Sequence, residues 1–242
     1  MRFYATALLI AGTAFAQIAT DRPAVTDSSV VVPAGTVQAE NGFADTVTQG
    51  QQTLDGPETW LRIGVASKTE LRLIAPDYFD LPRPGSGFGD FAVGVKQQLG
   101  PAAGFDLSLV LTLSLPAGAP AISSHGYDPS LQLPWSRSLS PNWTAAGMLS
   151  VYAPTVNRSH LVTGETTFLL DRQLTRTWDA FLEYAGDFPE NGRPRHLLHA
   201  GTALKLGQNQ QIDFHVGVGL SAAAVDRLIG AGYSFRFAAF KR

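Results

Sequence analysis

From Val37 onward, apolar and polar residues alternate with a period of two along most of the chain. The clearest run starts at Phe105 and places an apolar residue at every second position up to Leu115. Asp106 is the first of the intervening positions. A period of two is typical of a β-strand, whereas a helix repeats at about 3.6 residues. The alternation predicts twelve strands, near residues 37–47, 61–65, 69–75, 91–96, 105–115, 127–136, 143–152, 161–170, 178–187, 196–206, 211–218 and 229–237.

The connections between these strands alternate in length. Short turns fall near residues 67, 102, 140, 174 and 208, and longer linkers are expected at 48–57, 76–88, 116–126, 153–160, 188–195 and 221–227. Hairpins with short turns at one end and long loops at the other are typical of an up-and-down β-barrel. No boundary interrupts the pattern, so we expect one all-β, antiparallel barrel domain.

The amino-terminal sequence has the order of a secretory signal peptide. Arg2 precedes an apolar run, and the small-residue motif Ala14-Phe15-Ala16 follows that run. We therefore predict a signal peptide at 1–16, a periplasmic lead-in segment at 17–35 that could also contact the lumen, and a barrel at 36–242. No later stretch reaches the roughly 18 uninterrupted apolar residues that a membrane helix needs.

Composition favours a barrel in a membrane over a soluble exported β-protein, which is the alternative. A soluble sandwich also alternates, but it shows its polar faces to water and is richer in lysine and glutamate. Here charged residues make up 16% of the chain and lysine occurs four times. Aromatic residues lie near strand ends on the apolar faces, as in membrane-interface girdles: Trp135, Trp143, Tyr233 and Phe237. A closed barrel satisfies every backbone donor in lipid, so we predict a porin-like transmembrane β-barrel of about twelve strands.

The face opposite the bulky apolar residues collects the charges of the predicted strands. These candidate lumen-lining residues, which would set selectivity, are Glu40, Arg62, Glu70, Arg72, Asp90, Lys96, Asp106, Asp128, Glu165, Asp179, Glu183, His199, Lys205, Asp213, His215 and Arg236. Charges of both signs can pair across the bore and hold the barrel closed. They can equally leave a gap that conducts a small solute, and the sequence leaves both possibilities open.

The histidines do not predict a metal site. His196 and His199 are three residues apart and point to opposite faces of a strand, so they cannot share one ion. His199 and His215 share the lumen parity, but pairing through the turn between them sets His199 opposite Gly217 and His215 opposite Gly201. We therefore expect the two rings not to meet, and a lumen hydrogen bond or size filter is the favoured role.

Other motifs also argue against catalysis and against a cofactor. Ser159 and His160 are adjacent, so on a strand they point apart rather than forming a nucleophile–base pair. The glycine-rich stretch at 85–90 precedes no predicted helix, which a phosphate-binding loop requires. The chain has no cysteine, its formal net charge is −2 and no basic run occurs. We expect neither an enzyme, a metal site nor a nucleic-acid partner.

The stretch DRPAVTDSSVVVPAGTVQAENG, residues 21–42, resembles the opening signature of a bacterial outer-membrane β-barrel family. This family carries the name MetA-pathway of phenol degradation, and its members are often called transporters. Later stretches are similar in the same order: PETWLRIGVASKTELRL (57–73), GFGDFAVGVKQQL (87–99), LSLPAG (113–118), YDPSLQLPWSRSL (127–139), FLEYAGDFP (181–189) and GAGYSFRF (230–237). The resemblance implies passage of small molecules, such as aromatic or hydrophobic ones, and no active-site residues. The residues after Phe237, AAFKR, depart from the aromatic end that barrel-assembly signals usually have.

Together these features predict a channel in the outer membrane of a Gram-negative bacterium, reached by export through the periplasm. Small molecules would diffuse through its charged lumen, without a cofactor. The expected partners are outer-membrane lipid, a small-molecule solute and the outer-membrane assembly machinery. The alternative is a closed barrel with a structural or surface-interaction role. A more distant one is an outer-membrane lipid hydrolase that depends on His160 or His199.

Overall fold

The computed structural model describes residues 17–82 and 85–240, so the expected signal peptide at 1–16 lies outside the described residues. Within these ranges, no helix is long and apolar enough to cross a membrane. The strands are β1 (Thr36–Thr48), β2 (Gln51–Gly56), β3 (Trp60–Ala66), β4 (Thr69–Ile74), β5 (Tyr78–Asp80), β6 (Gly87–Phe88), β7 (Phe91–Ala102), β8 (Phe105–Leu115), β9 (Asp128–Ser140), β10 (Trp143–Tyr152), β11 (Thr155–Val156), β12 (Ser159–His160), β13 (Thr163–Gln173), β14 (Trp178–Pro189), β15 (Arg195–Lys205), β16 (Gln210–Gly219) and β17 (Arg227–Ala238).

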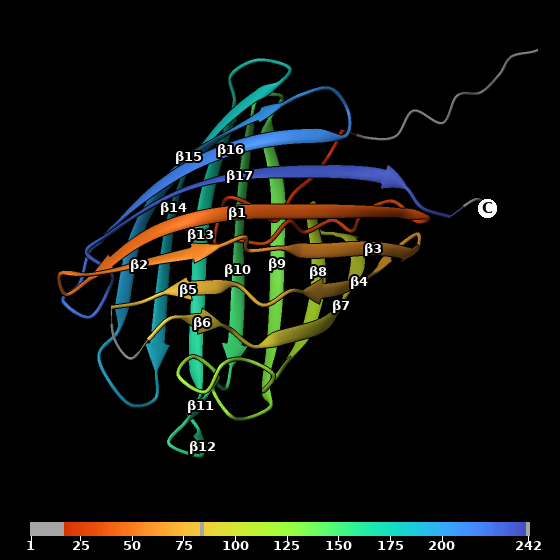
Figure 1. The fold of residues 1–242 in the computed structure, drawn as a ribbon. Coiled ribbons are helices and arrows are strands. Elements are labelled where there is room, and N and C mark those ends of the chain that lie inside the picture. Colours follow the sequence, from red (N-terminus) through yellow and green to blue (C-terminus); the bar gives the residue numbers. More distant parts are fainter. Residues whose placement is uncertain (1–16, 83–84, 241–242) are drawn as a thin grey trace, which may run out of the picture.

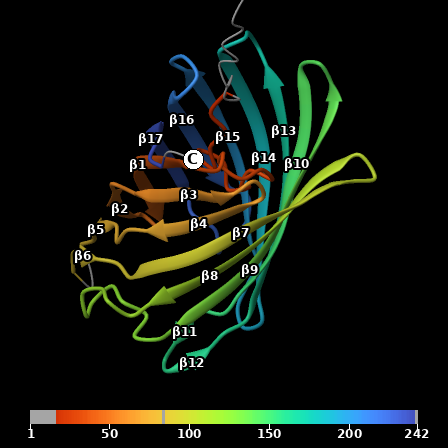
Figure 2. The same ribbon diagram turned by 90° about the vertical axis from the view of Figure 1, so that its right-hand side faces the viewer.

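Twelve strands form one closed antiparallel barrel, which confirms the predicted fold class (Figures 1 and 2). The ring runs β1-β3-β4-β7-β8-β9-β10-β13-β14-β15-β16-β17, and β17 returns to β1. The closing pair extends from Thr36 opposite Ala238 to Val47 opposite Arg227. Closure leaves no sheet edge in the ring, so the backbone groups of these strands are paired with neighbouring strands.

Three short strands extend the ring at its loop end. β2 pairs with β1 through Asp45–Leu54, and β3 pairs with β1 through Gln38–Arg62. The two strands therefore follow one another along the same edge of β1, and residues 57–59 interrupt the ladder between them. The loops predicted at 48–57 and 76–88 were therefore wrong in part, because they contain β2, β5 and β6. Gln49 and Gly50 both have positive φ, 51° and 74°, as a tight two-residue hairpin turn requires.

The two faces of the strands meet different surroundings, as the alternation predicts. Phe168, Leu182 and Phe214 point outward and are 53%, 54% and 57% exposed. Charged residues of the opposite parity, such as Arg62 and Lys96, are fully buried inside the ring. The outer surface is therefore apolar around the barrel, and the polar groups lie in the interior.

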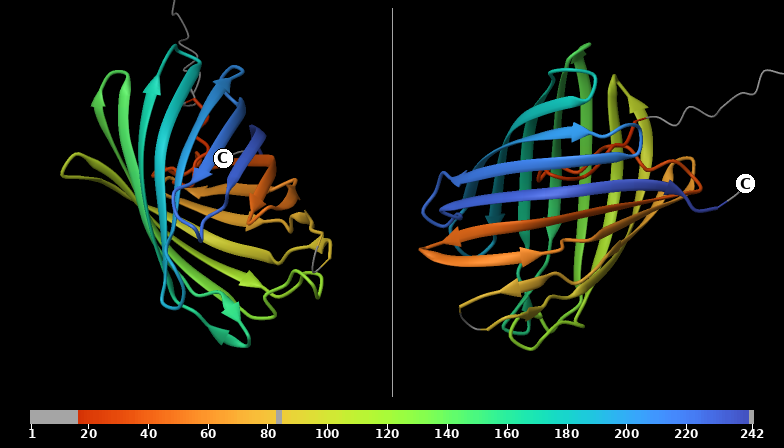
Figure 3. Two further views of the ribbon diagram at one scale, coloured as in Figure 1. Left: turned by 90° about the vertical axis from the view of Figure 1, so that its left-hand side faces the viewer. Right: turned by 45° about the horizontal axis from the view of Figure 1, so that its top comes forward.

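Residues 18–34, here called the amino-terminal segment, lie inside the ring without regular secondary structure (Figure 3). The segment enters beside the short turn between β15 and β16, where the Ile18 amide donates to the Gln208 carbonyl at 2.9 Å. It leaves through Gly35, whose amide donates to the Gly64 carbonyl at 2.7 Å. Val32 and Ile18 are each 2% exposed and the wall residue Val110 is fully buried, so the interior is packed by the segment against the wall.

Candidate functional site

Buried carboxylates of the barrel wall hold the backbone of the amino-terminal segment. Glu40 accepts hydrogen bonds from the amides of Asp21 and Arg22 at 2.9 and 3.0 Å. Across the lumen, Glu183 accepts from the amides of Val25 and Thr26 at 2.9 and 2.7 Å, and from the Thr26 hydroxyl at 2.6 Å. A segment without its own secondary structure must satisfy its buried amides elsewhere, and these carboxylates do so with charge-assisted hydrogen bonds.

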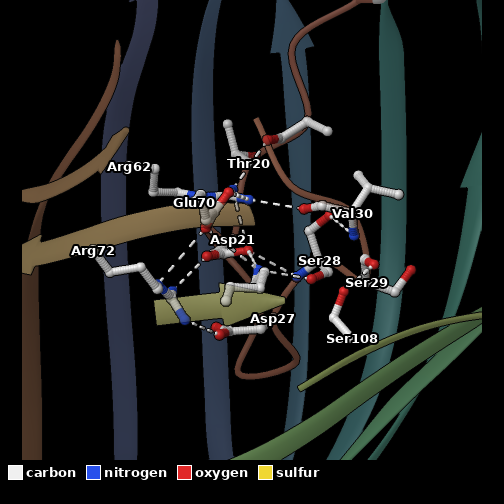
Figure 4. Close-up of polar contacts among 12 residues, drawn as sticks. Thr20, Asp21, Asp27, Ser28, Ser29, Val30, Arg62, Glu70, Arg72 and Ser108 are labelled. Atoms are coloured by element: carbon white, nitrogen blue, oxygen red, sulfur yellow. Dashed lines mark hydrogen bonds and ion pairs between the residues drawn. The ribbon is translucent and has the colours of Figure 1, made fainter. Parts of the chain in front are cut away.

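An ion cluster ties the same segment to three neighbouring strands (Figure 4). The Asp21 carboxylate lies 3.2 Å from the Arg62 guanidinium, 2.5 Å from that of Arg72 and 3.0 Å from the Lys96 amine. Arg72 also binds the Asp27 carboxylate at 2.7 Å. Because all these groups are buried, breaking one pair would leave an uncompensated charge in the interior.

Wall residues complete the cluster and bind the rest of the segment. Arg62 also pairs with Glu40 at 2.9 Å and with Glu70 at 2.8 Å. The second Glu70 oxygen accepts from the Val32 amide at 2.8 Å. The Ser108 hydroxyl donates to the Ser29 carbonyl at 2.6 Å. The segment is therefore bound along its length rather than at one point.

Two paired glycines make room for Arg22 of the segment. Gly42 on β1 lies opposite Gly232 on β17. A Cβ at Gly42 would lie 2.2 Å from the Arg22 Cζ, and one at Gly232 would lie 2.5 Å from its Nε. The guanidinium forms an ion pair with Glu58 and lies 3.5 Å from the Asp213 carboxylate. Only residues without a side chain allow this close approach of the guanidinium to the wall.

His199 and His215 meet in the lumen, which corrects the expectation that their rings stay apart. The predicted register holds, with His199 opposite Gly217 and His215 opposite Gly201. Their nearest ring nitrogens are nevertheless 2.9 Å apart, and the other His199 nitrogen lies 2.8 Å from Glu183. Diagonal neighbours on adjacent strands are within reach of long side chains. Gly230 on β17, opposite His215, leaves space for that ring, since a Cβ there would lie 2.0 Å from the His215 Nε2.

The remaining predicted residues of the loop end hold loops or neighbouring strands. Asp90 accepts from the amides of Gly118 and Ser124, both at 2.9 Å. Burial would raise the pKa of Asp90, but hydrogen bonds from Ser123, Ser124 and Gly118 outweigh burial and lower it. Asp128 accepts from the Thr155 amide at 2.9 Å, and Glu165 accepts from the Ser150 hydroxyl at 2.9 Å.

Towards the short turns, Asp179 and Lys205 form an ion pair across β14 and β15. Arg236 donates to the Asn209 side chain at 3.2 Å, and Asp106 lies opposite Ser136 on the next strand. The structure thus separates the predicted lumen residues into the central cluster and two sets nearer the barrel ends. Their role in selectivity stays a prediction.

His160 and Ser159 do not form a nucleophile–base pair. The His160 Nε2 lies 3.1 Å from the Tyr127 carbonyl oxygen, and both residues are exposed at the loop end. Within residues 17–82 and 85–240, no group of three or more histidine, aspartate or glutamate side chains is arranged to hold a metal ion.

Sequence reasoning missed Asp21 and Asp27, the two segment carboxylates of the central cluster. The inward charges of the wall residues could have indicated that these aspartates lie in the lumen. The neighbouring strands β1, β3, β4 and β7 carry three inward cations and two inward carboxylates in the cluster: Arg62, Arg72, Lys96, Glu40 and Glu70. A buried excess of positive charge needs an anion from another part of the chain, and the preceding segment holds two aspartates.

The segment lies between two cavities of the lumen. The central cavity, about 310 Å³, is lined by Trp60, Glu58 and Asp77 together with Asp21 and Asp27 of the segment. The turn-side cavity, about 340 Å³, is lined by the same two aspartates and by wall residues towards the short turns, among them Thr144, Asp171, Asp179, Phe181 and Lys205. Because Asp21 and Asp27 line both cavities, the segment forms the partition between them.

A third cavity continues towards the loops. This loop-side cavity, about 450 Å³, is lined by the apolar residues Ile74, Phe79, Leu81 and Ile122 and by polar residues that include Asp90, Ser114 and Ser124. Asp77 lines both this cavity and the central one. Burial, followed by the nearby Glu58, raises the pKa of Asp77 to about 6. The three cavities therefore follow one another through the barrel, with a titratable carboxyl at the first junction and the segment at the second.

A family model described as "Putative MetA-pathway of phenol degradation" matches residues 20–237 of the chain. A comparison with curated proteins gives no match.

Solved structures resemble the barrel. The COG4313 outer membrane channel from Pseudomonas putida F1 superposes with a TM-score of 0.66 at 11% identity, over 87% of this chain and 98% of that chain. The KdgM porin in complex with disordered oligogalacturonate gives a TM-score of 0.59 at 10% identity, over 84% and 99%. The CymD monoaromatic hydrocarbon channel gives 0.50 at 10% identity, over 87% and 90%. At these identities the likeness concerns the fold, which is that of outer-membrane barrels.

Proposed function

The chain belongs to the family described as "Putative MetA-pathway of phenol degradation", and from this premise we propose that it is an outer-membrane channel for small molecules. Solutes diffuse through the lumen without chemical change. One observation carries the proposal: three cavities lie in series inside the closed barrel, and neighbouring cavities share lining residues. A barrel that served only as a scaffold would have no need of a row of cavities along its interior.

The amino-terminal segment controls this passage. It separates the central from the turn-side cavity, so a solute crosses only when the segment moves aside. Many of its contacts with the wall are hydrogen bonds and ion pairs, which water and a solute can replace. The predicted lumen residues then act on the solute where they line the cavities: Asp90 at the loop side, His215 in the central cavity, and Asp179 with Lys205 at the turn side.

Cavity size and lining favour small aromatic solutes. Cavities of about 310 to 450 Å³ accept a single-ring molecule and not an extended oligosaccharide. Ile74, Phe79 and Ile122 offer apolar surface at the loop side, and Trp60 offers an aromatic face in the central cavity. The similarity in fold to a monoaromatic hydrocarbon channel agrees with this solute class.

The cellular location follows from the same proposal. Residues 1–16 direct export, the chain crosses the periplasm, and the outer-membrane assembly machinery inserts the barrel. The apolar belt then contacts outer-membrane lipid.

Liposome efflux tests the function directly. We expect the refolded chain to release phenol-sized solutes from sealed vesicles and to retain tri- and tetrasaccharides. Replacing Arg62→Gln and Arg72→Gln together should shift the reversal potential of the remaining conductance towards cations, because two positive charges leave the lumen. An unchanged reversal potential would remove these arginines from the conduction path.

A closed barrel with a structural or surface-interaction role is the second candidate. The observation in its favour is the segment itself, which fills the lumen and is held there by buried ion pairs. Zero efflux and zero conductance from protein that shows the heat-dependent gel shift of a folded barrel would establish this candidate.

A further inference from the structure

We propose that Arg62, Arg72 and Lys96 form a binding site for small carboxylates, occupied in this structure by Asp21 of the chain's own amino-terminal segment. A solute carboxylate competes with Asp21 for the three cations and thereby releases the segment. The site itself is independent of transport, but its use as a gate rests on the proposed function.

The convergence of the three cations is the first argument. They come from three neighbouring strands, β3, β4 and β7, and all contact one carboxylate. Figure 4 shows Arg62 and Arg72 pointing to Asp21. One Asp21 oxygen lies 3.2 Å from Arg62 and 3.0 Å from Lys96, and the other lies 2.5 Å from Arg72. The Ser28 amide donates to Asp21 as well, at 2.9 Å. Fixed guanidinium and ammonium donors around two oxygens are the usual recognition of a carboxylate.

The charge balance of the wall is the second argument. Arg62 is neutralised by the wall itself, through Glu40 at 2.9 Å and Glu70 at 2.8 Å. Among the wall carboxylates that the structure describes, Arg72 and Lys96 form an ion pair only with Glu70, each at 3.9 Å. Their close anionic partners, Asp21 and Asp27, both belong to the segment. Without the segment, the wall therefore presents buried positive charge that requires an anion.

The third argument is access from the central cavity. Asp21 and Asp27 line this cavity together with Trp60. The Arg72 guanidinium lies 4.7 Å from the centre of the Trp60 ring. An aromatic carboxylate therefore finds a ring surface beside the cation that binds its carboxylate. Benzoate is a simple molecule that combines both groups.

Tethering explains why Asp21 normally holds the site. Asp21 and the strands belong to one chain, so its effective concentration at the cations is high. The hydrogen bonds that Glu40, Glu70 and Glu183 accept from amides of the segment add to that advantage. Benzoate must therefore bind weakly to the intact protein and more tightly once the competing carboxylate is removed.

Calorimetry on the refolded full chain in detergent tests the site. Asp21→Ala should bind benzoate about tenfold or more tightly than the unaltered protein. Benzamide, which has the same shape without the charge, should show no such gain. Adding Arg72→Gln to Asp21→Ala should abolish the gain. Glu165→Gln is the matched control, because it removes another inward carboxylate that pairs with Ser150 rather than with the cluster.

A second measurement needs no variant and remains valid if Asp21→Ala does not fold. Benzoate added to the unaltered protein should accelerate hydrogen exchange at the amides of Asp21, Arg22 and Ser28, whereas benzamide should not. Equal responses to benzoate and benzamide, or no gain of affinity in folded Asp21→Ala, would overturn the site. Efflux and conductance are measured separately, so a site that binds benzoate in a barrel that conducts nothing would refute only the channel.

Discussion

The substitution Glu183→Gln should loosen one half of the amino-terminal segment and leave the other half in place. Glu183 accepts two amide hydrogen bonds, from Val25 and Thr26, and also contacts His199 at 2.8 Å. A glutamine at this position has a single acceptor oxygen, so its NH2 group faces one of the two amides. That amide keeps no acceptor, and the other hydrogen bond loses its charge.

The magnitude follows from the burial of these groups. Leaving one buried amide unsatisfied costs about 1–3 kcal/mol, and a middle value of about 2 kcal/mol is appropriate for one lost acceptor. At about 1.4 kcal/mol per factor of ten, local opening becomes roughly 30-fold more frequent. Hydrogen exchange at Val25 and Thr26 in detergent micelles measures this directly.

The reciprocal variant supplies the control. Glu40→Gln removes the acceptor of the Asp21 and Arg22 amides, so exchange should rise there and not at Val25 and Thr26. Equal acceleration at both pairs of amides in either variant would mean that the segment opens as one unit. No acceleration in either variant would show that these carboxylates do not hold the segment.

Two further predictions concern the charges and the glycines of the lumen. Burial and Glu58 raise the pKa of Asp77 to about 6. Rising pH therefore ionises Asp77, and the preference of the channel for cations should increase between about pH 5 and pH 7. In the Asp77→Asn variant, the reversal potential should no longer depend on pH over this range. Gly42→Ala should displace the Arg22 guanidinium, since the new Cβ would lie 2.2 Å from its Cζ, and should raise conductance in a barrel that still folds. Gly164→Ala, where a Cβ meets nothing within 4 Å, is the matched control; equal conductance in the two glycine variants would contradict the role of Arg22.

The positions of the strands, and the side of the sheet to which each side chain points, could be predicted because lipid and lumen impose opposite requirements on alternate residues. Phe168 and Phe214 face outward, and Arg62 and Lys96 face inward, as the parity of the sequence indicates. That β2 continues the place of β3 beside β1 could not be predicted from this alternation. At the loop end both faces of Gln51–Gly56 are largely polar, so the apolar signal disappears while the hydrogen-bond ladder continues.

The contacts inside the barrel were harder to predict from the sequence than the strands were. Parity says which side chains point inward, but not what they meet there. His199 and His215 touch because their side chains reach each other diagonally between β15 and β16, and because Gly230 leaves space for the His215 ring. Asp21 finds its cations through contacts that connect distant parts of the chain, and no local period encodes such contacts.

In the proposed channel, the amino-terminal segment lies in the lumen and restricts passage between two cavities. The chain has no cysteine, and the hydroxyl oxygens of Ser29 on the segment and Ser136 on β9 are 2.7 Å apart. The most direct test is therefore the single-channel conductance of the double variant Ser29→Cys with Ser136→Cys, recorded before and after reduction. We predict a disulfide in the folded barrel, low conductance while it is intact and larger openings once it is reduced. Failure of the disulfide to form, or the same conductance in both states, would contradict a segment that restricts passage through the lumen.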